Sequence, residues 1–342
     1  MKISQARSLW EAAGVYCNTA SYGLPPRPAW DALQSALADW HGGRTSWEHW
    51  GLSTEGARAS FARLVGVEAE RVAVGSTISE LIGTVVTALP DGARVVVPDI
   101  EFTSTLFPIL VQERLQIKTV PAASLADAVA EGAEAVAFSA VQMSTGEVAD
   151  CPRILAAAAH TGAVTICDAT QAVGWLPLRA SQFDAVACSA YKWLMSPRGS
   201  AFLAVSDRLL ERIVPHSAGW YAGADVHDSY FGPPLRLATS ARRLDVSPAW
   251  FSWVGTQPAL ELIEHIGVDA IHAHNLKLAN RFRAGIGAEP GDSAIVCADL
   301  PGAAARLERA GIVAALRGGR LRTSWHLYND EADVDRVLEL VT

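Results

Sequence analysis

From about residue 60 the chain alternates short β-rich apolar runs with amphipathic or alanine-rich helical stretches. Seven β-rich runs follow one another, namely "RVAVGS", "ARVVVPD", "IKTVPA", "AVAFSAV", "AVTICDA", "AVACSA" and "SAFLAVS". This rhythm is typical of an α/β fold with a doubly wound, mostly parallel sheet and helices on both of its faces. The last two runs are close together, so one strand there is expected to be antiparallel.

Beyond the seventh run the rhythm changes. The stretch "GTQPALELIEHIGVDAIHAHNLKLANRFRAGI" predicts a long helix with a break at Gly267. A strand, a helix, two strands and a final helix are predicted after it, and together they indicate a small α+β domain. A chain of 342 residues suits one large and one smaller domain. We expect residues 18–265 to form the large domain, and residues 1–17 and 266–342 to form the small domain.

Composition argues against several classes of function. The net charge is −8 and no basic stripe is present, so a nucleic-acid binder is not expected. The five cysteines form no CxxC pair and the histidines lack metal-ligand spacing, so neither a disulfide framework nor a metal site is expected. The first residues lack the apolar core of a signal peptide, and no apolar run approaches the roughly 20 residues that span a bilayer. The sequence thus indicates a soluble, cytoplasmic protein without a membrane segment.

One lysine lies in an unusual setting, in the stretch "CSAYKWLMSPRG" that follows the sixth β-rich run. Of the 28 basic residues, only Lys2, Lys118, Lys192 and Lys277 are lysines. A lysine among apolar neighbours, in a chain whose usual cation is arginine, indicates a need for an amine that can lose its proton and attack a carbonyl. The alternative is that Lys192 is an ordinary solvated surface lysine.

Polar groups also follow two other β-rich runs. "VGSTISE" places Ser76 and Thr77 at a helix N-terminus, where N–H groups, hydroxyls and the helix dipole suit a phosphate. "TICDATQAVG" ends its strand at Asp168, with Gln171 close behind. Either group is also compatible with an ordinary helix cap. Ligands of open α/β sheets lie outside the carboxyl ends of the strands, so a phosphate cradle, an aspartate and a lysine there together match the needs of pyridoxal 5′-phosphate (PLP).

The chain resembles the class V aminotransferase group of fold-type I PLP enzymes, which includes cysteine desulfurases, kynureninases, isopenicillin-epimerase-like proteins and carbon–sulfur lyases. The similarity runs from "VYCNTASYGLPP" to "RTSWHLYNDEADVD" and is most specific in "CDATQAVG", "SAYKWLMSPRG" and the C-terminal Arg-x-Ser…Tyr-Asn stretch. It implies that the substrate is a small molecule, an amino acid, and that the protein is a homodimer with active sites at the interface between the subunits.

The resemblance implies roles around the cofactor ring. Lys192 matches the lysine that forms the internal aldimine, and Asp168 matches the partner of the pyridine nitrogen. Phe102 in "DIEFTST" matches the aromatic residue that stacks on the ring. Gln171 matches a residue that hydrogen-bonds the phenolic oxygen, and Gln142 in "SAVQMSTGE" lies where a side chain usually faces the same oxygen or the substrate.

The resemblance also implies contacts to the cofactor phosphate. Ser76 and Thr77 match the phosphate-binding turn, and Ser189 and Tyr191 match further phosphate contacts. Tyr191 departs from the histidine that desulfurases have before the lysine, although a phenol hydroxyl serves a phosphate equally well. Ser247 in "RLDVSP" matches a Ser/Thr that reaches the phosphate of the neighbouring subunit, but the usual Gly-Thr-Pro is absent.

For the substrate, Asn18 and Arg322 match the groups that hold the α-carboxylate. The implied reaction passes through a Cα carbanion (quinonoid), and its fate stays open: β-elimination from a sulfur-substituted amino acid is slightly favoured over transamination, and racemisation or epimerisation is a further alternative. Residues 306–322 contain no cysteine where desulfurases carry a nucleophilic one, and Cys297 lies in a strand-like run. We therefore expect no enzyme-bound persulfide.

Two other classes of protein fit the sequence less well. A Rossmann-type nucleotide-binding oxidoreductase needs G-x-G-x-x-G in the first βα turn, which "VGSTIS" lacks. A degenerate, non-catalytic binding module would be expected to have lost Lys192 or Asp168, and both are present. The segment "DWHGGRTSWEHW", with Trp40, Trp47 and Trp50, has two interpretations: it lines the substrate entrance, or it is a helix edge packed at the domain interface.

Overall fold

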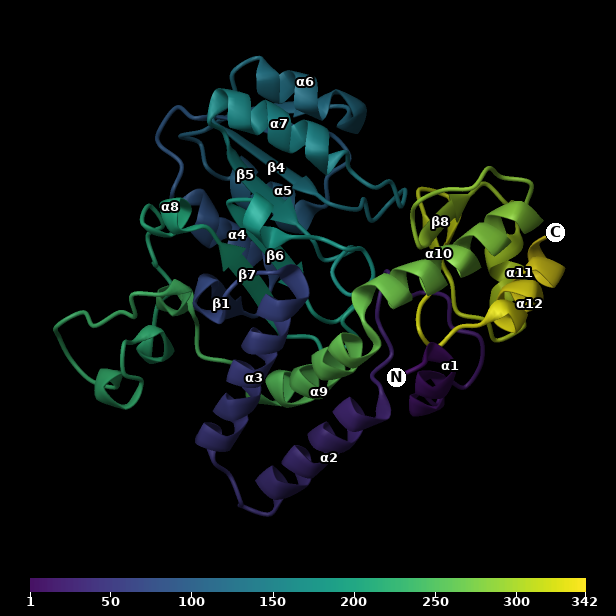
Figure 1. The fold of residues 1–342 in the computed structure, drawn as a ribbon, viewed down its shortest axis with the longest axis horizontal. Helices are drawn as coiled ribbons and strands as arrows, with labels where there is room; N and C mark the ends of the chain where they lie inside the picture. Colours follow the sequence, from purple (N-terminus) through teal and green to yellow (C-terminus); the bar gives the residue numbers. More distant parts are fainter.

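A seven-stranded sheet forms the centre of the larger part of the chain in the computed structural model, which describes residues 1–342 (Figure 1). The strands lie in the order β1-β7-β6-β5-β4-β2-β3. Their bounds are β1 (Val72–Gly75), β2 (Arg94–Pro98), β3 (Gln116–Val120), β4 (Ala135–Ser139), β5 (Val164–Asp168), β6 (Ala185–Ser189) and β7 (Ala201–Val205). Each strand coincides with one of the seven predicted runs, so the predicted fold class is confirmed.

Strand β7 is the antiparallel member of this sheet, as its short connection to β6 predicts. It pairs antiparallel with β6 on one side and with β1 on the other, whereas β2 to β6 pair in parallel. In the parallel register Ser139 lies opposite Asp168 at the ends of β4 and β5, and β6 ends beside them at Ser189. Residues that end separate strands in the sequence thus gather along one edge of the sheet.

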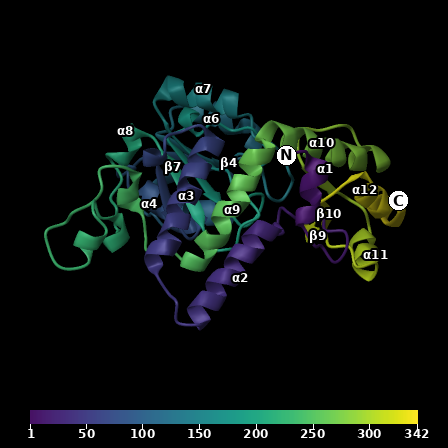
Figure 2. The same cartoon turned by 60° about the horizontal axis from the view of Figure 1, so that its bottom comes forward.

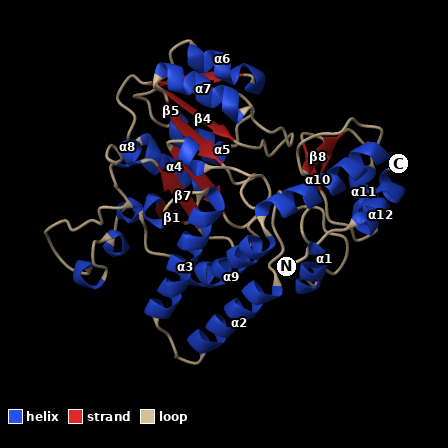
Figure 3. Ribbon diagram, in the orientation of Figure 1, coloured by secondary structure: helices blue, strands red, loops and turns tan.

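Helices cover both faces of the sheet (Figure 3). In β2, Val96 packs into one hydrophobic cluster, with α3, α6, α7 and α9, while Val95 and Val97 pack into the other, with α4, α5 and α8. The helices of this part are α2 (Arg27–His41), α3 (Trp47–Val65), α4 (Ile78–Val86), α5 (Thr103–Leu110), α6 (Leu125–Ala130), α7 (Cys151–Thr161), α8 (Asp207–Leu210) and α9 (Trp250–Ile266). None of the helices is both long and apolar enough to cross a bilayer.

Trp40, near the end of α2, and Trp47 and Trp50, at the start of α3, have aromatic neighbours in or near helix α9. The rings of Trp40 and Trp50 lie 5.3 and 5.1 Å from the ring of Phe251 in α9, measured between centroids. The ring of Trp47 lies 5.0 Å from that of Trp220. Both α2 and α3 lie along α9 in this region (Figure 2). The segment therefore packs on α9, while its place at a domain interface and its part in a substrate entrance stay predictions.

A second, antiparallel sheet has the order β8-β10-β9 and lies with helices α10 to α12 at the other end of the molecule (Figure 2). Its elements are α10 (Val268–Gly285), β8 (Ile295–Ala298), α11 (Ala303–Arg309), β9 (Ala315–Arg317), β10 (Arg320–Ser324) and α12 (Glu331–Val341). Gly267, with φ 93°, separates α9 from α10 at the predicted break. The N-terminal segment, which begins with α1 (Ile3–Ala6), forms isolated bridges from Tyr16 to Val313 and from Asn18 to Ser324. The division into domains at residues 18 and 265 stays a prediction.

Candidate active site

Lys192 lies in a tight loop directly after β6, and its side chain is only 5% exposed. Met195 N donates a hydrogen bond to Lys192 O (3.0 Å), which closes the loop. The N-terminal segment packs against this loop and forms a clamp on it, because Gly23 N donates a hydrogen bond to Tyr191 O (2.9 Å). A Cβ atom on Gly23 would lie 2.0 Å from Lys192 O, so a glycine is needed for this close approach.

Replacing Gly23 with alanine should therefore displace the lysine loop. Since the new Cβ would meet backbone rather than a flexible side chain, we expect a loss of about 1–3 kcal/mol in the free energy of unfolding and weaker cofactor binding. The matched control is Gly219→Ala, because no heavy atom lies within 4 Å of a Cβ there. Chemical unfolding and cofactor titration of both variants test this, and an unaffected Gly23→Ala protein would contradict the clamp.

Burial makes the Lys192 amine a weaker base than an ordinary lysine. Desolvation lowers its pKa from 10.5 to about 8, with Asp168 opposing that shift and Arg322 and Arg317 adding to it. Such a shift leaves roughly 300-fold more neutral amine near pH 7 than an ordinary lysine has. Lys192 Nζ also lies 5.6 Å from the ring centroids of both Phe102 and Tyr191. The structure thus provides an amine that can act as a nucleophile or a base near neutral pH.

The lowered pKa of Lys192 makes the stability of the cofactor-free protein depend on pH. The folded state releases the proton near pH 8 and the unfolded state near 10.5, so the unfolded state binds more protons in between and stability rises with pH over that window. Lys192→Met should therefore stabilise the cofactor-free protein near pH 7, by on the order of 3 kcal/mol. That advantage should shrink as the pH rises from about 8 to 10.5. Urea unfolding of both proteins across this range measures the difference in their free energies of unfolding. A difference that does not change with pH would contradict the assignment.

Asp168 ends β5 and is buried, with each carboxylate oxygen held by a separate group. Oδ1 accepts a hydrogen bond from Thr170 N (2.8 Å), and Oδ2 accepts one from the Thr105 hydroxyl (2.9 Å). The bond from Thr170 is the turn cap that the sequence also allowed. The bond from Thr105, on the first turn of α5, was not expected from the sequence. The carboxylate is therefore both a cap and a fixed anion beside the lysine.

A second carboxylate, that of Glu101, is buried nearby and was missed by the sequence analysis. It accepts hydrogen bonds from Phe102 N (2.8 Å), Ser139 N (2.8 Å), the Ser139 hydroxyl and Gln142 Nε2 (3.0 Å). Burial, and then the charge of Asp168, raises the pKa of Glu101. The Glu101 carboxylate thus positions Phe102 and Gln142, two residues assigned to the site. The glutamate in "DIEFTST" gives no local signal of burial, because its partners come from a later strand end.

The two glutamines of the predicted site are both buried and both hydrogen-bonded within the chain. Gln171 Nε2 donates to Ala20 O (2.9 Å), and Gln171 Oε1 accepts from the indole of Trp193 (2.7 Å). Gln142 is held by Glu101, as described above. One amide hydrogen of Gln171 is left for the phenolic oxygen, so the role that the resemblance implies for this residue stays a prediction.

The predicted phosphate-binding turn is a helix cap with a competing carboxylate. The Thr77 hydroxyl accepts a hydrogen bond from Glu80 N (3.3 Å), and Ser76 N donates to Glu80 Oε2 (2.9 Å). Thr77 is thus the N-cap of α4, and the Glu80 carboxylate reaches back to the backbone N–H of the residue before the cap. A phosphate at this helix N-terminus has to replace the Glu80 carboxylate at Ser76 N.

The other predicted phosphate contacts, Ser189, Tyr191 and Ser247, differ in how deeply they are buried. Ser189 is buried at the end of β6, and Tyr191 is half-buried beside Arg198, whose guanidinium lies 5.0 Å from the ring centroid. Ser247 is exposed, two residues beyond Asp245, whose carboxylate accepts a hydrogen bond from Val74 N (2.8 Å) in β1. An exposed Ser247 is compatible with a contact to a neighbouring subunit, which stays a prediction.

Arg322 is fully buried, and no carboxylate of the chain pairs with it. Its Nη1 donates to Met143 O (2.8 Å) and its Nη2 to the Ser21 hydroxyl (2.6 Å), while Asn18 Oδ1 lies 3.5 Å from Nη2. Its Nε has no hydrogen-bond partner. Desolvation, followed by repulsion from Arg317, lowers the pKa of Arg322 to about 10. A buried guanidinium without an anionic partner is energetically unfavourable.

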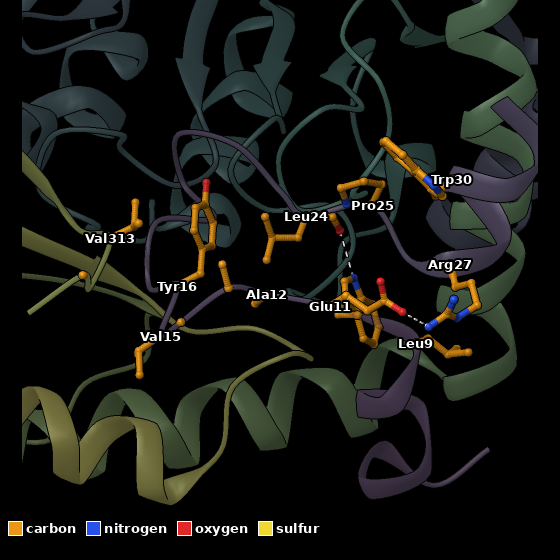
Figure 4. Close-up of a pocket in the computed structure, with 14 residues that line it drawn as sticks. Leu9, Glu11, Ala12, Val15, Tyr16, Leu24, Pro25, Arg27, Trp30 and Val313 are labelled. Atoms are coloured by element: carbon orange, nitrogen blue, oxygen red, sulfur yellow. Dashed lines mark hydrogen bonds and ion pairs between the residues drawn. The ribbon is translucent and has the colours of Figure 1, made fainter. Parts of the chain in front are cut away.

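A cavity of about 650 Å³ lies between the N-terminal segment, the start of α2 and the loop that holds Gly311 and Val313 (Figure 4). Its charged lining residues, Glu11 and Arg27, are paired with each other. The hydroxyl of Tyr16, also in the lining, donates to Tyr22 O (2.7 Å). This cavity therefore offers no free charge to a phosphate or a carboxylate, and the candidate active site is the sheet edge that carries Lys192.

The groups at that edge fit PLP by their chemistry. They provide a buried amine of lowered pKa and an aspartate in fixed position, and the buried Arg322 has an Nε without a hydrogen-bond partner. Together with the sheet topology they define the class of fold-type I PLP-dependent enzymes. Within that class the chain belongs to the class V aminotransferase family, whose family model matches residues 24–304.

Similar proteins of known sequence span most of the chain. An uncharacterized aminotransferase, YcbU, from Bacillus subtilis is 24% identical over 86% of this chain and 85% of its own. Isopenicillin N epimerase from Streptomyces clavuligerus is 27% identical over 83% and 82%. Kynureninases and probable cysteine desulfurases are also similar. Among solved structures, C-DES, a cystine C–S lyase solved with glycine linked to its PLP cofactor, superposes with a TM-score of 0.87 at 20% identity, over 99% of this chain and 98% of its own.

Proposed function

We propose that this PLP-dependent enzyme acts on an α-amino acid, with Lys192 bonding the cofactor, Asp168 pairing with its ring nitrogen and Arg322 anchoring the substrate carboxylate. The observation that carries the proposal is a buried lysine with a pKa of about 8 that shares a site with a buried arginine without an anionic partner. An α-amino acid brings the amine and the carboxylate that these two groups call for. The remaining proposed contacts are Asn18, Ser76, Thr77, Phe102, Gln142, Gln171, Ser189, Tyr191 and Ser247.

Bound PLP supplies an aldehyde that captures amines and a protonated ring that accepts electrons from the substrate's Cα. Lys192 takes the proton from Cα, because its lowered pKa leaves neutral amine available. Asp168 keeps the ring nitrogen protonated, while Thr105 and Thr170 hold the two carboxylate oxygens in place. Arg322 fixes the substrate's orientation through a charge-assisted contact.

We favour β-elimination from a sulfur-substituted amino acid over desulfuration through an enzyme-bound persulfide. Cys297 lies in β8, where its thiol donates to Ser144 O (3.1 Å) and burial raises its pKa, so it is a poor nucleophile. Between α11 and β10 the chain forms β9 and a short turn at Gly318 and Gly319, without a long loop or a cysteine. The probable cysteine desulfurases among the relatives make a direct test of this point necessary.

The second candidate function is transamination, in keeping with the aminotransferase name of the Bacillus relative. Racemisation or epimerisation is less favoured, and so is a nucleotide-binding oxidoreductase, since the first βα turn lacks G-x-G-x-x-G. A screen of amino acids, cysteine conjugates included, for ammonia, sulfide, pyruvate and other keto acids separates these outcomes. Keto acid with pyridoxamine phosphate and no ammonia would favour transamination, and a labelled persulfide on Cys297 would overturn the elimination proposal.

The working unit is proposed to be a cytoplasmic homodimer with active sites at the subunit interface. Ser247, exposed in the single chain, is the residue proposed to reach the partner's cofactor phosphate. Light scattering of the active protein addresses this, since a fully active monomer would rule it out.

Replacing Arg322 with alanine should raise KM for the amino acid while leaving the spectrum of the resting enzyme unchanged. A hydrogen bond to a charged group contributes about 1.5–3 kcal/mol, which corresponds to a rise in KM of roughly 10- to 150-fold. The matched control is Arg320→Ala in the same strand, because Arg320 is exposed and donates to Cys297 O (2.7 Å). Steady-state kinetics of both variants measure the effect, and an unchanged KM in Arg322→Ala would place the carboxylate site elsewhere.

A further inference from the structure

One face of the small sheet carries three arginines. Arg317 ends β9 and lies directly opposite Arg320 in β10, and Arg322 follows two residues later. Opposed residues and residues two apart share a face of an antiparallel sheet, whereas Leu321, on the other face, is buried in the core formed with α10 to α12. The alternation in "RLR" therefore directs Arg320 and Arg322, together with Arg317, to one side.

Two of these arginines converge on one hydroxyl. Ser21 Oγ accepts a hydrogen bond from Arg322 Nη2 (2.6 Å) and another from Arg317 Nη2 (3.1 Å). The other hydrogen bond of the Arg317 guanidinium goes to a backbone carbonyl, that of Leu316 (2.7 Å). Two guanidinium groups thus meet at a neutral oxygen, without a carboxylate to balance either of them.

Cationic side chains outnumber carboxylates at this edge of the site. The charges of Arg317 and Arg322 both disfavour the protonated form of Lys192, so three cationic groups lie within electrostatic reach of one another. Asp168 is the carboxylate that favours protonated Lys192 there. The α-carboxylate of an amino acid would neutralise Arg322 alone. Arg317 would remain an unmatched, half-buried cation beside the substrate.

We propose that Arg317 binds a second carboxylate, carried on the substrate's side chain, so that the enzyme selects amino acids with an acidic side chain over neutral ones. The proposal rests on the proposed function, in which Arg322 takes the α-carboxylate. Ser21 fixes the separation of the Arg317 and Arg322 guanidinium groups, because its hydroxyl oxygen accepts a hydrogen bond from each of them. The sequence alone assigned no role to Ser21 or Arg317, although Ser21 lies within "VYCNTASYGLPP".

The test compares non-reactive acids that differ by one charge. Succinate with its monoamide succinamate, and glutarate with glutaramate, are titrated against the holoenzyme by calorimetry. For at least one of the two lengths, the dicarboxylate should bind 10-fold or more tightly than the monoamide, as expected for a charge-assisted contact. Arg317→Gln should remove that difference and leave the affinity for the monoamide unchanged, while the control Arg320→Gln should preserve it.

Equal affinities of the dicarboxylates and their monoamides in the unmutated enzyme would overturn the proposal, and this comparison does not depend on any variant folding. An equal loss of affinity for both kinds of acid in Arg317→Gln would also overturn it, since both arginines would then share the α-carboxylate. In either case monoamide binding that is lost in Arg322→Ala would leave the proposed function standing. If none of the acids binds, both the Arg322 assignment and the role of Arg317 fail.

Discussion

Replacing Lys192 with alanine is expected to abolish turnover and to remove the visible absorption band of the lysine-bound cofactor. Lys192 combines burial with a pKa of about 8, and the nearby Arg317 and Arg322 cannot replace it because an amine, not a guanidinium, forms the bond to the cofactor aldehyde. We expect kcat to fall by a factor of about 10⁴ or more, since both the covalent anchor and the general base are lost.

The matched control for this variant is Lys118→Ala. Lys118 lies on strand β3 with a half-exposed side chain and pairs with Glu131 (2.5 Å). Its removal should change neither the absorption band nor kcat. A Lys192→Ala protein that keeps both the band and the activity would show that another amine bonds the cofactor.

Asp168→Asn should still bind the cofactor but should lower kcat by roughly 10²- to 10⁴-fold. Asparagine keeps an oxygen that accepts from Thr170 N, so the turn after β5 is preserved. It cannot hold the pyridine nitrogen protonated, because it carries no negative charge, and the ring then becomes a poor electron acceptor. Absorbance titration and steady-state kinetics separate these effects, and near-native kcat would show that Asp168 is a cap alone.

The strands of the sheet could be predicted because each of them is marked by a short run of neighbouring apolar residues. Each β-rich run forms a strand, and within β2 the neighbours Val95 and Val96 pack on opposite faces, which a two-sided apolar run implies. Gly267 marks the end of α9 because its φ of 93° suits glycine and disfavours other residues. The short link between β6 and β7 left too little chain for a parallel crossover.

Several residues of the candidate site had no such signal. Glu101 lies in an ordinary loop segment, and its burial depends on Ser139 and Gln142, which reach it only after the sheet has formed. Ser21 and Arg317 are almost 300 positions apart and meet because the N-terminal segment lies beside the small sheet. Such contacts depend on tertiary structure, which spacing in one sequence does not encode.

Other residues of the candidate site were assigned from sequence motifs. Lys192 was found as a rare lysine among apolar residues and Asp168 as a carboxylate at a strand end, and the structure places both at one edge of the sheet. The phosphate-binding turn was found in the same way, but its N–H group is engaged by Glu80, three residues beyond Thr77. The Thr77 N-cap explains why this turn has two valid interpretations, and cofactor binding decides between them.

The central claim, that Lys192 bonds the cofactor, is tested most directly by reducing the holoenzyme with borohydride and mapping the modified residue by mass spectrometry. The chain has four lysines, so the candidates are Lys2, Lys118, Lys192 and Lys277. Reduction fixes the cofactor to its lysine, and trypsin should then release a single peptide of residues 180–198 that carries the pyridoxyl mass on Lys192. A pyridoxyl group on one of the other three lysines, or on none, would contradict the account.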